Sequence, residues 1–411
     1  MNDSFQPRVR LNLSVEQARG RLFQRIASKS PCSLPLDSIL GLVLAEELVA
    51  PFDLPRFTNS AMDGFAVRAA DTSRASEAAP VRLMVAGAVE AGEIWTGTCK
   101  PGSAVRISTG AALPNGCDAV VPHETVLERG HEIVLTQPVA TGQHVRPTGE
   151  DVRAGMPVLS PGTVIRPQEI GLLAALGFET ASVIAAPMVS ILSIGQELRP
   201  SSKPAQVPDA NGPMLAAQVQ CAGGNVVRVA QSDGDSSGLS ELLDDLGQES
   251  DLIITSGGIS DSTADTMAGL LDGHPEAELW NVRLRPGRHF GFGRFGQAVV
   301  LSLPGNPVAA FVGFEFFGRL AIGLLSGRKD DSDRRFALAT EPLTGARGRT
   351  DVIRGHVRID SAGQLWIAPT VHRGSGIVSS LLAVNGLAIL PESIERIEAG
   401  QPVEIRWMGY Q

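Results

Sequence analysis

The sequence predicts a multidomain α/β protein, in which a three-layer α/β domain is joined to separate β-rich parts. Its 411 residues exceed what one ordinary hydrophobic core organises, so roughly two to four domains are expected. Between Met188 and Leu325, apolar strands alternate with amphipathic helices, which is typical of a parallel sheet covered on both faces. Short strand-like runs precede and follow this stretch, and they predict a small β-rich domain and a barrel-like tail.

The elements before the alternating stretch are predicted from caps and turns. A helix from Ser14 to about Ser28 has Ser14 as its N-cap and Gln17 at the capping-box position. From about Pro51 to Pro138, strands are predicted at PVRLMVAGAV, SAVRISTGA, DAVVPHETVLE and HEIVLTQPV. A second helix over Pro167–Leu176 is followed by Gly177, which suits the left-handed position after a helix.

The alternating stretch predicts a sheet whose strand ends carry a ligand site. Strands are predicted at MVSILSIG, NVVRVAQ, DLIITSGG and AVVLSLPGN, with helices at NGPMLAAQVQCAGG, GLSELLDDLGQE and PVAAFVGFEFFGRLAIGLL. Ligands of such sheets bind beyond the carboxyl ends of the strands, so the loops after SILSIG, LIITSGG and VVLSLPGN are expected to meet. After Gly327, strand patterns return at RFALATEPL, DVIRGHVRID, QLWIAPTV and PVEIRW.

Composition and missing motifs exclude several classes of function. A net charge of -9 argues against a nucleic-acid-binding face. The four cysteines are scattered, which argues against both a zinc site and a disulfide framework. The apolar stretch 298–325 is interrupted by prolines and charges, and the N-terminus lacks an apolar signal core, so a soluble cytoplasmic protein without a membrane span is expected. The motifs of serine hydrolases, zinc proteases and P-loop enzymes do not occur.

Two of the strand-end loops have the composition of anion-binding loops. In the first, two glycines permit a close backbone approach, and their N–H groups and the neighbouring hydroxyls could hold a phosphate or the polar edge of a ring. Its candidate residues are Ser256, Gly257, Gly258 and Ser260. The second is Pro304-Gly305-Asn306-Pro307, with Asn306 as N-cap and Pro307 at the first position of a helix. Each loop alone could also be an ordinary connection between strand and helix.

Charged residues near these loops complete the candidate site. Arg285 and Arg288 flank a Pro-Gly turn, so both guanidinium groups could converge on one anion. Taken alone, the motif favours two exposed turn arginines, because most arginines lie at the surface. Several carboxylates stand in turns or at strand and helix ends, where each has a structural explanation as a turn or capping residue. They are Asp63, Asp151, Glu197, Asp209 and Asp265.

Together these segments resemble the molybdopterin molybdenumtransferase family, which comprises bacterial MoeA and the E-domain of animal gephyrin. The similarity spans essentially the whole chain. It is carried, in the family's order and spacing, by FTNSAMDGFAVRAAD, RISTGAALPNGCDAVVPHE, GEDVRAGMPVLSPGTVIRPQEIGLLAALG, LIITSGGIS, LPGNPVAA and GSGIVSSLLAVNGLAILPE.

The resemblance implies a fold and a reaction. It implies a three-layer α/β molybdopterin-binding domain (1–26 and 181–327), a small linking domain (27–45 and 147–180), a β-rich insert (46–146) and a C-terminal β-barrel (328–411). Family members form homodimers, with the active cleft between the α/β domain of one subunit and the insert of the other. The family reaction inserts molybdate into adenylylated molybdopterin with release of AMP, and it uses Mg²⁺. A molybdopterin adenylyltransferase is an expected partner.

The resemblance also implies roles for individual residues. Asp63, Glu197, Asp209 and Asp265 are expected to be catalytic, with Asp209 and Asp265 as ligands of Mg²⁺, a cation that prefers carboxylate and phosphate oxygens. The expected substrate-binding residues are Thr109, Asp151, Ser256, Gly257, Gly258, Ser260, Arg285, Arg288, Pro304, Gly305, Asn306, Pro307 and Ser375.

The sequence departs from the family pattern at three places. The family's G-D-E-L has Gln196 in place of its aspartate, and both lysines of K-P-G-K-P are arginines here. The lysine that often follows the site aspartate is absent, because Thr266-Met267-Ala268 stands there. Two alternatives stay open at this point: a molybdopterin adenylyltransferase, which shares the S-G-G and P-G-N-P loops, and a non-catalytic molybdopterin-binding scaffold.

Overall fold

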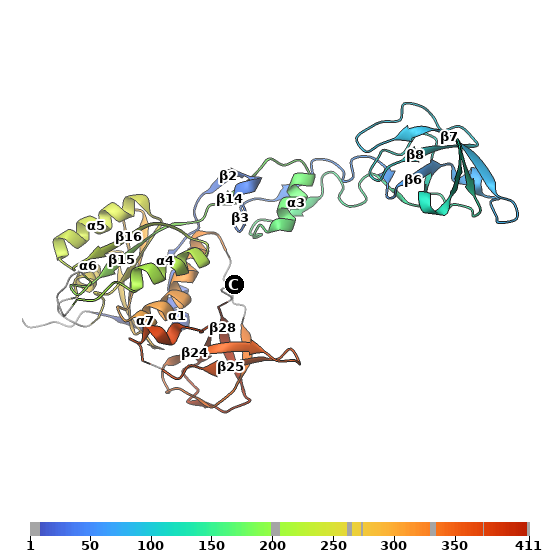
Figure 1. Ribbon diagram of the computed structural model, residues 1–411. Coiled ribbons are helices and arrows are strands. Elements are labelled where there is room, and N and C mark those ends of the chain that lie inside the picture. The colour runs from blue at the N-terminus through green and yellow to red at the C-terminus, as the bar shows by residue number, and fades with distance from the viewer. Residues whose placement is uncertain are drawn as a thin grey trace, which may run out of the picture. The chain divides into compact units, whose positions relative to one another are not determined.

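The computed structural model describes residues 9–198, 206–260, 265–272, 274–328, 334–372 and 374–408. The chain divides into two compact units, and Figure 1 labels their elements. The first unit comprises Met1–Ser33, Gly41–Ala45 and Ser182–Gln411, and the second comprises Leu34–Leu40 and Glu46–Ala181. The predicted linking domain does not form a unit of its own in this division.

A seven-stranded sheet lies at the centre of the first unit. Its order is β1 (Leu11–Leu13), β18 (Glu278–Val282), β20 (His289–Phe295), β21 (Ala298–Leu303), β17 (Leu252–Ser256), β15 (Met188–Ile194) and β16 (Asn225–Ser232). The last four strands are parallel, as predicted. The sheet as a whole is mixed, because β20 runs antiparallel to both of its neighbours. A short connection between β18 and β20 permits this, since antiparallel strands need no crossover helix.

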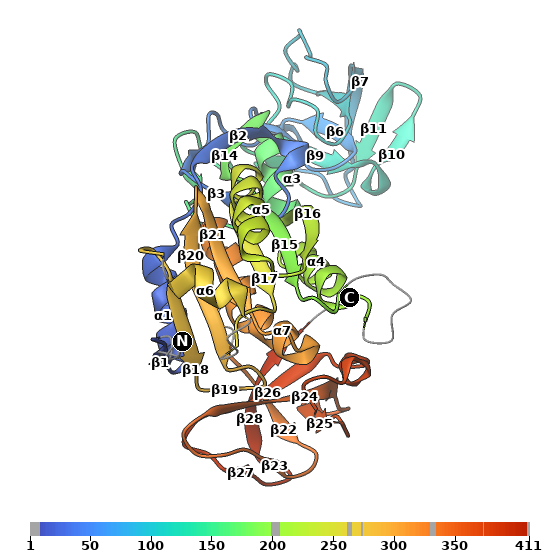
Figure 2. The same cartoon turned by 90° about the vertical axis from the view of Figure 1, so that its left-hand side faces the viewer.

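Helices cover both faces of this sheet, which confirms the three-layer prediction. On one face lie α1 (Val15–Arg25), α4 (Asn211–Cys221), α7 (Pro307–Gly313) and α8 (Arg319–Leu325), whose apolar side chains share one core cluster with the sheet. On the other face, turned towards the viewer in Figure 2, α5 (Ser236–Glu249) and α6 (Thr266–Asp272) bury leucines and Met267 in a second cluster.

The predicted capping box at the first helix is confirmed. The Ser14 hydroxyl accepts a hydrogen bond from the Gln17 N–H at 3.1 Å, and the Gln17 side chain accepts one from the Ser14 N–H at 2.8 Å. Two of the helix's otherwise unpaired N–H donors are satisfied in this way, which fixes the start of α1.

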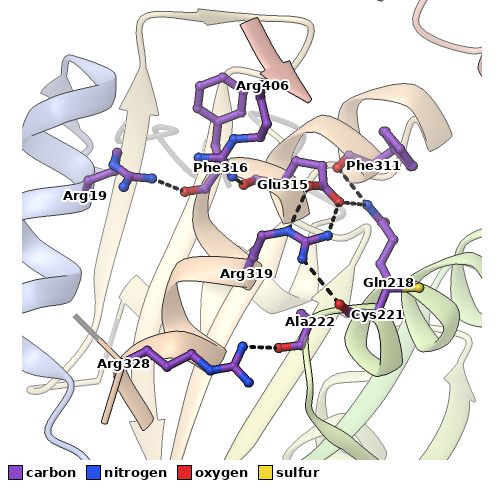
Figure 3. A network of polar contacts seen from close by, with 10 residues as sticks. All are labelled: Arg19, Gln218, Cys221, Ala222, Phe311, Glu315, Phe316, Arg319, Arg328 and Arg406. Atoms are coloured by element: carbon purple, nitrogen blue, oxygen red, sulfur yellow. Dashed lines mark hydrogen bonds and ion pairs between the residues drawn. The ribbon is translucent and has the colours of Figure 1, made fainter. Parts of the chain in front are cut away.

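The long helix Pro307–Leu325 contains a π-helical turn at Phe314–Gly318 that separates α7 from α8. Its mean hydropathy of 1.8 would suit a membrane span, but 83% of the apolar window is buried inside the protein, as in a core helix. The Glu315 carboxylate, only 1% exposed, accepts from Gln218 at 2.9 Å and from Arg319 at 3.0 Å (Figure 3). Arg406 donates to the Glu315 carbonyl, so this turn also anchors the C-terminal region.

The C-terminal part of the first unit is a closed five-stranded barrel, as predicted. Its strands pair in the order β24 (Thr350–Ile359), β25 (Leu365–Pro369), β22 (Arg335–Ala339), β28 (Pro402–Trp407) and β26 (Gly386–Leu390), and β26 pairs back with β24. A short strand from the α/β side, β19 (Leu284–Arg285), pairs parallel with β24. The barrel therefore joins the α/β domain through backbone hydrogen bonds as well as through packing.

The second unit is β-rich, as predicted for this region. Its main sheet has the order β10 (Leu127–Arg129), β11 (Glu132–Leu135), β7 (Val81–Val89), β8 (Ser103–Ile107), β6 (Gly64–Val67) and β9 (Ala119–Pro122). The predicted second helix, α3 (Pro167–Ala175), also belongs to this unit and is followed by Gly177 at φ 74°, as the sequence indicated.

Candidate active site

A cavity of about 1180 Å³ lies in the first unit, at the carboxyl ends of β15, β17 and β21. All three loops that were predicted to meet contribute to its wall, and barrel residues close a further side. Of the predicted site residues, the wall includes Glu197, Ser256, Gly257, Gly258, Ser260, Asp265, Arg285, Arg288, Pro304, Gly305, Asn306 and Ser375. Pro307 and Asp209 are not among the residues that line it.

The glycine loop after β17 approaches other backbone as closely as its sequence predicts. Gly257 has φ 97° and Gly258 has φ 63°, in the region that residues with a Cβ rarely adopt. A Cβ on Gly257 would stand 2.2 Å from the Ile194 carbonyl oxygen. The glycine is therefore required by the protein itself, because the loop after β17 crosses the end of β15 at backbone contact.

Asn211 at the start of α4 ties the two glycine-containing loops together. Its Nδ2 donates to the Ser256 hydroxyl at 2.9 Å and to the Gly305 carbonyl at 2.7 Å, and Ser256 in turn donates to the Pro304 carbonyl at 3.1 Å. The side chain is 9% exposed. Sequence reasoning treated this segment only as a helix start and missed the role of Asn211.

The Pro-Gly-Asn-Pro loop contacts the barrel. Asn306 is the N-cap of α7 and Pro307 its first residue, as predicted, but the Asn306 side chain makes no capping hydrogen bond. Its Nδ2 instead lies 3.4 Å from the Ser375 hydroxyl, and the Val308 N–H donates to the Ser375 carbonyl at 3.1 Å. Ser375 thereby reaches the strand-end loops from the barrel side.

Both signs of charge are present on the cavity wall. The exposed Arg285 and Arg288 flank the turn that leads from β18 into β20, and Glu197 and Asp265 supply carboxylates. Asp265 accepts a hydrogen bond from the Ser260 hydroxyl, which ties the residue before α6 to the segment that follows β17. This arrangement can bind an oxyanion and hold acidic groups beside it.

Arg354 on β24 is a cavity residue that sequence reasoning missed. It is 4% exposed and donates to the carbonyls of His372 at 2.9 Å and Gly374 at 3.3 Å. Burial lowers the pKa of its guanidinium group. In the part of the chain that the structure describes it has no carboxylate partner, so its charge is available to an anion in the cavity. The sequence does not single it out, because β24 also carries Asp351, His356 and Arg358.

Asp209 serves the helix start rather than the cavity wall. Its Oδ1 accepts hydrogen bonds from the N–H groups of Asn211 at 2.9 Å and Gly212 at 3.0 Å, which confirms its predicted capping position to within one residue. Its Oδ2 accepts from Gln231 at 3.3 Å.

Three predicted residues belong to the second unit and do not line this cavity: Asp63, Thr109 and Asp151. The exposed Asp63 carboxylate accepts from the Thr109 N–H at 2.7 Å and from its hydroxyl at 2.9 Å. Both hydrogen bonds lower the pKa of Asp63, and the one from the Thr109 backbone N–H has the larger effect. The carboxylate is thus oriented by a residue far away in the sequence. Asp151 is exposed in a turn and donates its N–H to the Leu54 carbonyl at 3.0 Å.

The carboxylates on the cavity wall are candidate ligands for magnesium. Among the described residues, no group of three His, Cys, Asp or Glu side chains could enclose a metal ion. Magnesium does not require such a group, because one or two carboxylates commonly hold it together with substrate phosphates. The oxygen donors on the cavity wall therefore fit magnesium bound jointly with a phosphorylated ligand.

The fold and the cavity together define an α/β protein whose strand-end cavity, lined by arginines and carboxylates, is completed by a barrel. Family models match three successive regions of the chain. Residues 13–177 match the MoeA N-terminal region (domain I and II), residues 190–323 a probable molybdopterin binding domain, and residues 337–406 the MoeA C-terminal region (domain IV).

Individual relatives match over nearly their whole length. Molybdopterin molybdenumtransferase 2 of Mycobacterium tuberculosis is 35% identical over 402 residues, which covers 95% of this chain and 98% of the relative. The molybdopterin molybdenumtransferase of Haemophilus influenzae is 32% identical, with 96% and 98% covered. The crystal structure of the molybdopterin biosynthesis MoeA protein from Pyrococcus horikoshii is similar with a TM-score of 0.81 and 29% identity, covering 98% and 100%. The chain belongs to the molybdopterin molybdenumtransferase (MoeA) family.

Proposed function

We propose that this enzyme acts in molybdenum cofactor biosynthesis by inserting molybdate into adenylylated molybdopterin with release of AMP. The observation that carries the proposal is a cavity at the strand ends on whose wall guanidinium groups and carboxylates stand together. Family membership supplies the chemical class of the substrates. Both molybdate and the phosphates are anions, whereas the chain has a net charge of -9, so local positive groups must attract them.

The positive groups are arranged to hold oxyanions. Arg285 and Arg288 lie on the cavity wall at either side of the Pro-Gly turn, and the buried Arg354 lines the cavity from the barrel side. A guanidinium group presents planar paired donors that suit phosphate and molybdate oxygens. We propose that these arginines bind the transferred oxyanion and the phosphates, with the hydroxyls of Ser260 and Ser375 as further contacts.

The acidic residues are proposed to position water and move protons. Glu197 and Asp265 lie on the same wall as the arginines, so a carboxylate is available beside a bound oxyanion. The hydrogen bond from Ser260 fixes the Asp265 carboxylate. Glu197 lies directly against Gly195, where a Cβ would stand 2.6 Å from its oxygens, so the glycine permits its position.

Mg²⁺ is part of the proposal. When bound, it would neutralise the phosphate charge that grows as AMP leaves. We propose Asp265 and Asp209 as its ligands. Asp265 is the stronger candidate, because it lies on the cavity wall, whereas one oxygen of Asp209 already caps α4.

The test of the proposal is AMP release and molybdenum uptake with adenylylated molybdopterin, molybdate and Mg²⁺. Asp265→Asn is expected to reduce AMP release by about 100-fold or more, in the range of losing one preorganised charged group. Asp272→Asn is the matched control, because Asp272 is exposed at the end of α6, the helix that Asp265 immediately precedes, and does not line the cavity. An Asp265→Asn enzyme as active as this control would contradict the assignment. ATP consumption without molybdenum uptake would indicate an adenylyltransferase, and neither activity would indicate a scaffold.

A homodimer is also proposed, with the β-rich insert of a second copy supplying Asp63 and Thr109. Mixing Asp63→Asn and Asp265→Asn chains tests this. If one complete site forms in each mixed dimer, activity returns to about a quarter of the wild-type value, because half of the dimers are mixed and each has one intact site. No recovery, with mixed dimers verified by mass, would contradict shared sites. A cytoplasmic location belongs to the same proposal.

A further inference from the structure

Arg10, near the start of the described chain, holds the loop that follows β17. Its Nη2 donates to the carbonyl oxygens of Ile259 and Ser260, both at 2.8 Å. The two partners are 249 and 250 residues away in the sequence. Arg10 immediately precedes β1, which pairs with β18 at the edge of the sheet. The N-terminal segment therefore contacts the backbone of a loop on the cavity wall.

This loop needs an anchor, because its beginning is intrinsically permissive. Gly257 and Gly258 both have positive φ, and glycine restricts the chain less than any other residue. After them, the Ile259 side chain is buried, 2% exposed, in the core cluster on the α5 and α6 face. Arg10 adds a further anchor on the backbone at the point where the loop reaches Ser260.

The two hydrogen bonds also set the direction of two peptide groups. In a trans peptide the C=O and N–H groups point in opposite directions, so a carbonyl turned towards Arg10 turns the N–H of the same peptide away from it. A guanidinium group suits this task, since it donates in a planar fork and its charge strengthens each hydrogen bond. Ser260, whose hydroxyl donates to Asp265, lies between these two peptides.

We propose that Arg10 is a positioning residue for the active site, which holds Ser260 and Asp265 at the cavity wall through the loop backbone. The expected effect on catalysis rests on the proposed function, whereas the expected effect on the loop rests on the hydrogen bonds of Arg10. Without Arg10, the loop stays attached by the buried Ile259 side chain and by the hydrogen bond from the Ala268 N–H to the Gly258 carbonyl at 2.9 Å, but the carbonyls of Ile259 and Ser260 lose their link to the N-terminal segment. The competent position of the Asp265 carboxylate is then less populated.

The kinetic test compares Arg10→Ala with Arg21→Ala. Arg21 is the matched control, because it also ties the N-terminal region to the sheet, through an ion pair with Glu278 at 2.7 Å that lies outside the cavity. Arg10→Ala is expected to lower kcat for AMP release 10- to 100-fold, with KM for adenylylated molybdopterin changed less than about threefold. Arg10→Lys should restore part of the rate, since one ammonium group can still donate to a carbonyl.

A double variant separates positioning from a general structural effect. If Arg10 acts through Asp265, adding Arg10→Ala to Asp265→Asn lowers the rate little further, whereas independent effects multiply. Multiplying effects, or a kcat for Arg10→Ala equal to that of Arg21→Ala, would overturn the proposal.

Hydrogen–deuterium exchange tests the structural part without any activity. Amides in the segment after Ser256 should exchange at least about tenfold faster in Arg10→Ala than in Arg21→Ala, and Arg10→Lys should lie between them. Equal exchange in the two alanine variants would overturn the proposal. If the wild-type chain released no AMP, the proposed function would fail, while this comparison would still decide whether Arg10 orders the loop.

Discussion

Gly257→Ala tests whether the loop after β17 is held by backbone contact. An alanine at φ 97° is strained by about 1–2 kcal/mol. The new Cβ would also stand 2.2 Å from the Ile194 carbonyl oxygen, and real Cβ atoms essentially never approach closer than 3.0 Å, so the backbones must separate by 0.8 Å or more. Overpacking of this kind costs a further ~1–3 kcal/mol, so the free energy of unfolding should fall by about 2–5 kcal/mol in total.

Gly363→Ala is the matched control for the conformational part of this cost. Gly363 has φ 80° in a barrel turn, and a Cβ there would meet no atom within 4 Å, so a loss of about 1–2 kcal/mol is expected. Stability is compared by urea denaturation, and function by AMP release. Gly257→Ala should be the less stable variant, and it alone should lose most of its activity. Equal stability and equal AMP release in the two variants would refute the reasoning.

Three further changes test other contacts. Thr109→Val removes one of the two hydrogen bonds that lower the pKa of Asp63, so NMR titration should show that pKa rising part of the way back to its ordinary value. Because the native pKa is the lower one, the stability this group confers is lost as pH falls from the unfolded-state pKa through the native pKa. In the variant the contribution is smaller, and its loss is complete at a higher pH. Arg319→Met removes the ion pair from the buried carboxylate of the π-helical turn and should destabilise the protein by about 3 kcal/mol in urea denaturation; an unchanged midpoint would contradict this. Arg354→Met should weaken molybdate binding in calorimetry by at least about tenfold, whereas Arg358→Met, exposed on the same strand, should not.

Local patterns predicted much of the fold, because they depend on neighbours in the sequence. The capping box at Ser14, the glycine stop at Gly177 and the strands of the α/β domain are all of this kind. The meeting of three loops at one sheet edge was also predictable, since parallel strands place their carboxyl ends together. The glycines at the end of β17 belong to the same group, because a paired glycine indicates close backbone contact before the contacting atom is known.

Features that depend on tertiary pairing were not predictable. No strand is predicted over HFGFGRF, whereas its pairing with β18 and β21 makes it the antiparallel strand β20. Glu315 reads as an interruption of an apolar helix, whereas in the fold it is buried against Gln218 and Arg319. The location of the Arg354 side chain depends on the strand register of the barrel, because the register decides whether an arginine on β24 faces water or the cavity.

The candidate site shows the same division. The loop residues were found because glycine, serine and proline at strand ends have a local explanation. Asp209 and Asp265 were treated as equivalent in the sequence, but only Asp265 lies on the cavity wall. Arg10 and Asn211 were missed, because each acts on a loop far away in the sequence through side-chain hydrogen bonds to its backbone or hydroxyl groups.

The cavity wall is built from two parts, the α/β domain and the barrel, which share the β19–β24 pairing and part of one hydrophobic core. An anion that contacts both parts therefore binds only when the barrel is docked on the α/β domain. By thermodynamic linkage, such a ligand at about 100 times its dissociation constant would stabilise docking by roughly 2.7 kcal/mol. Bound substrate would then hold the barrel reversibly against the α/β domain. The stability of the barrel's attachment should therefore differ between the filled and the empty site.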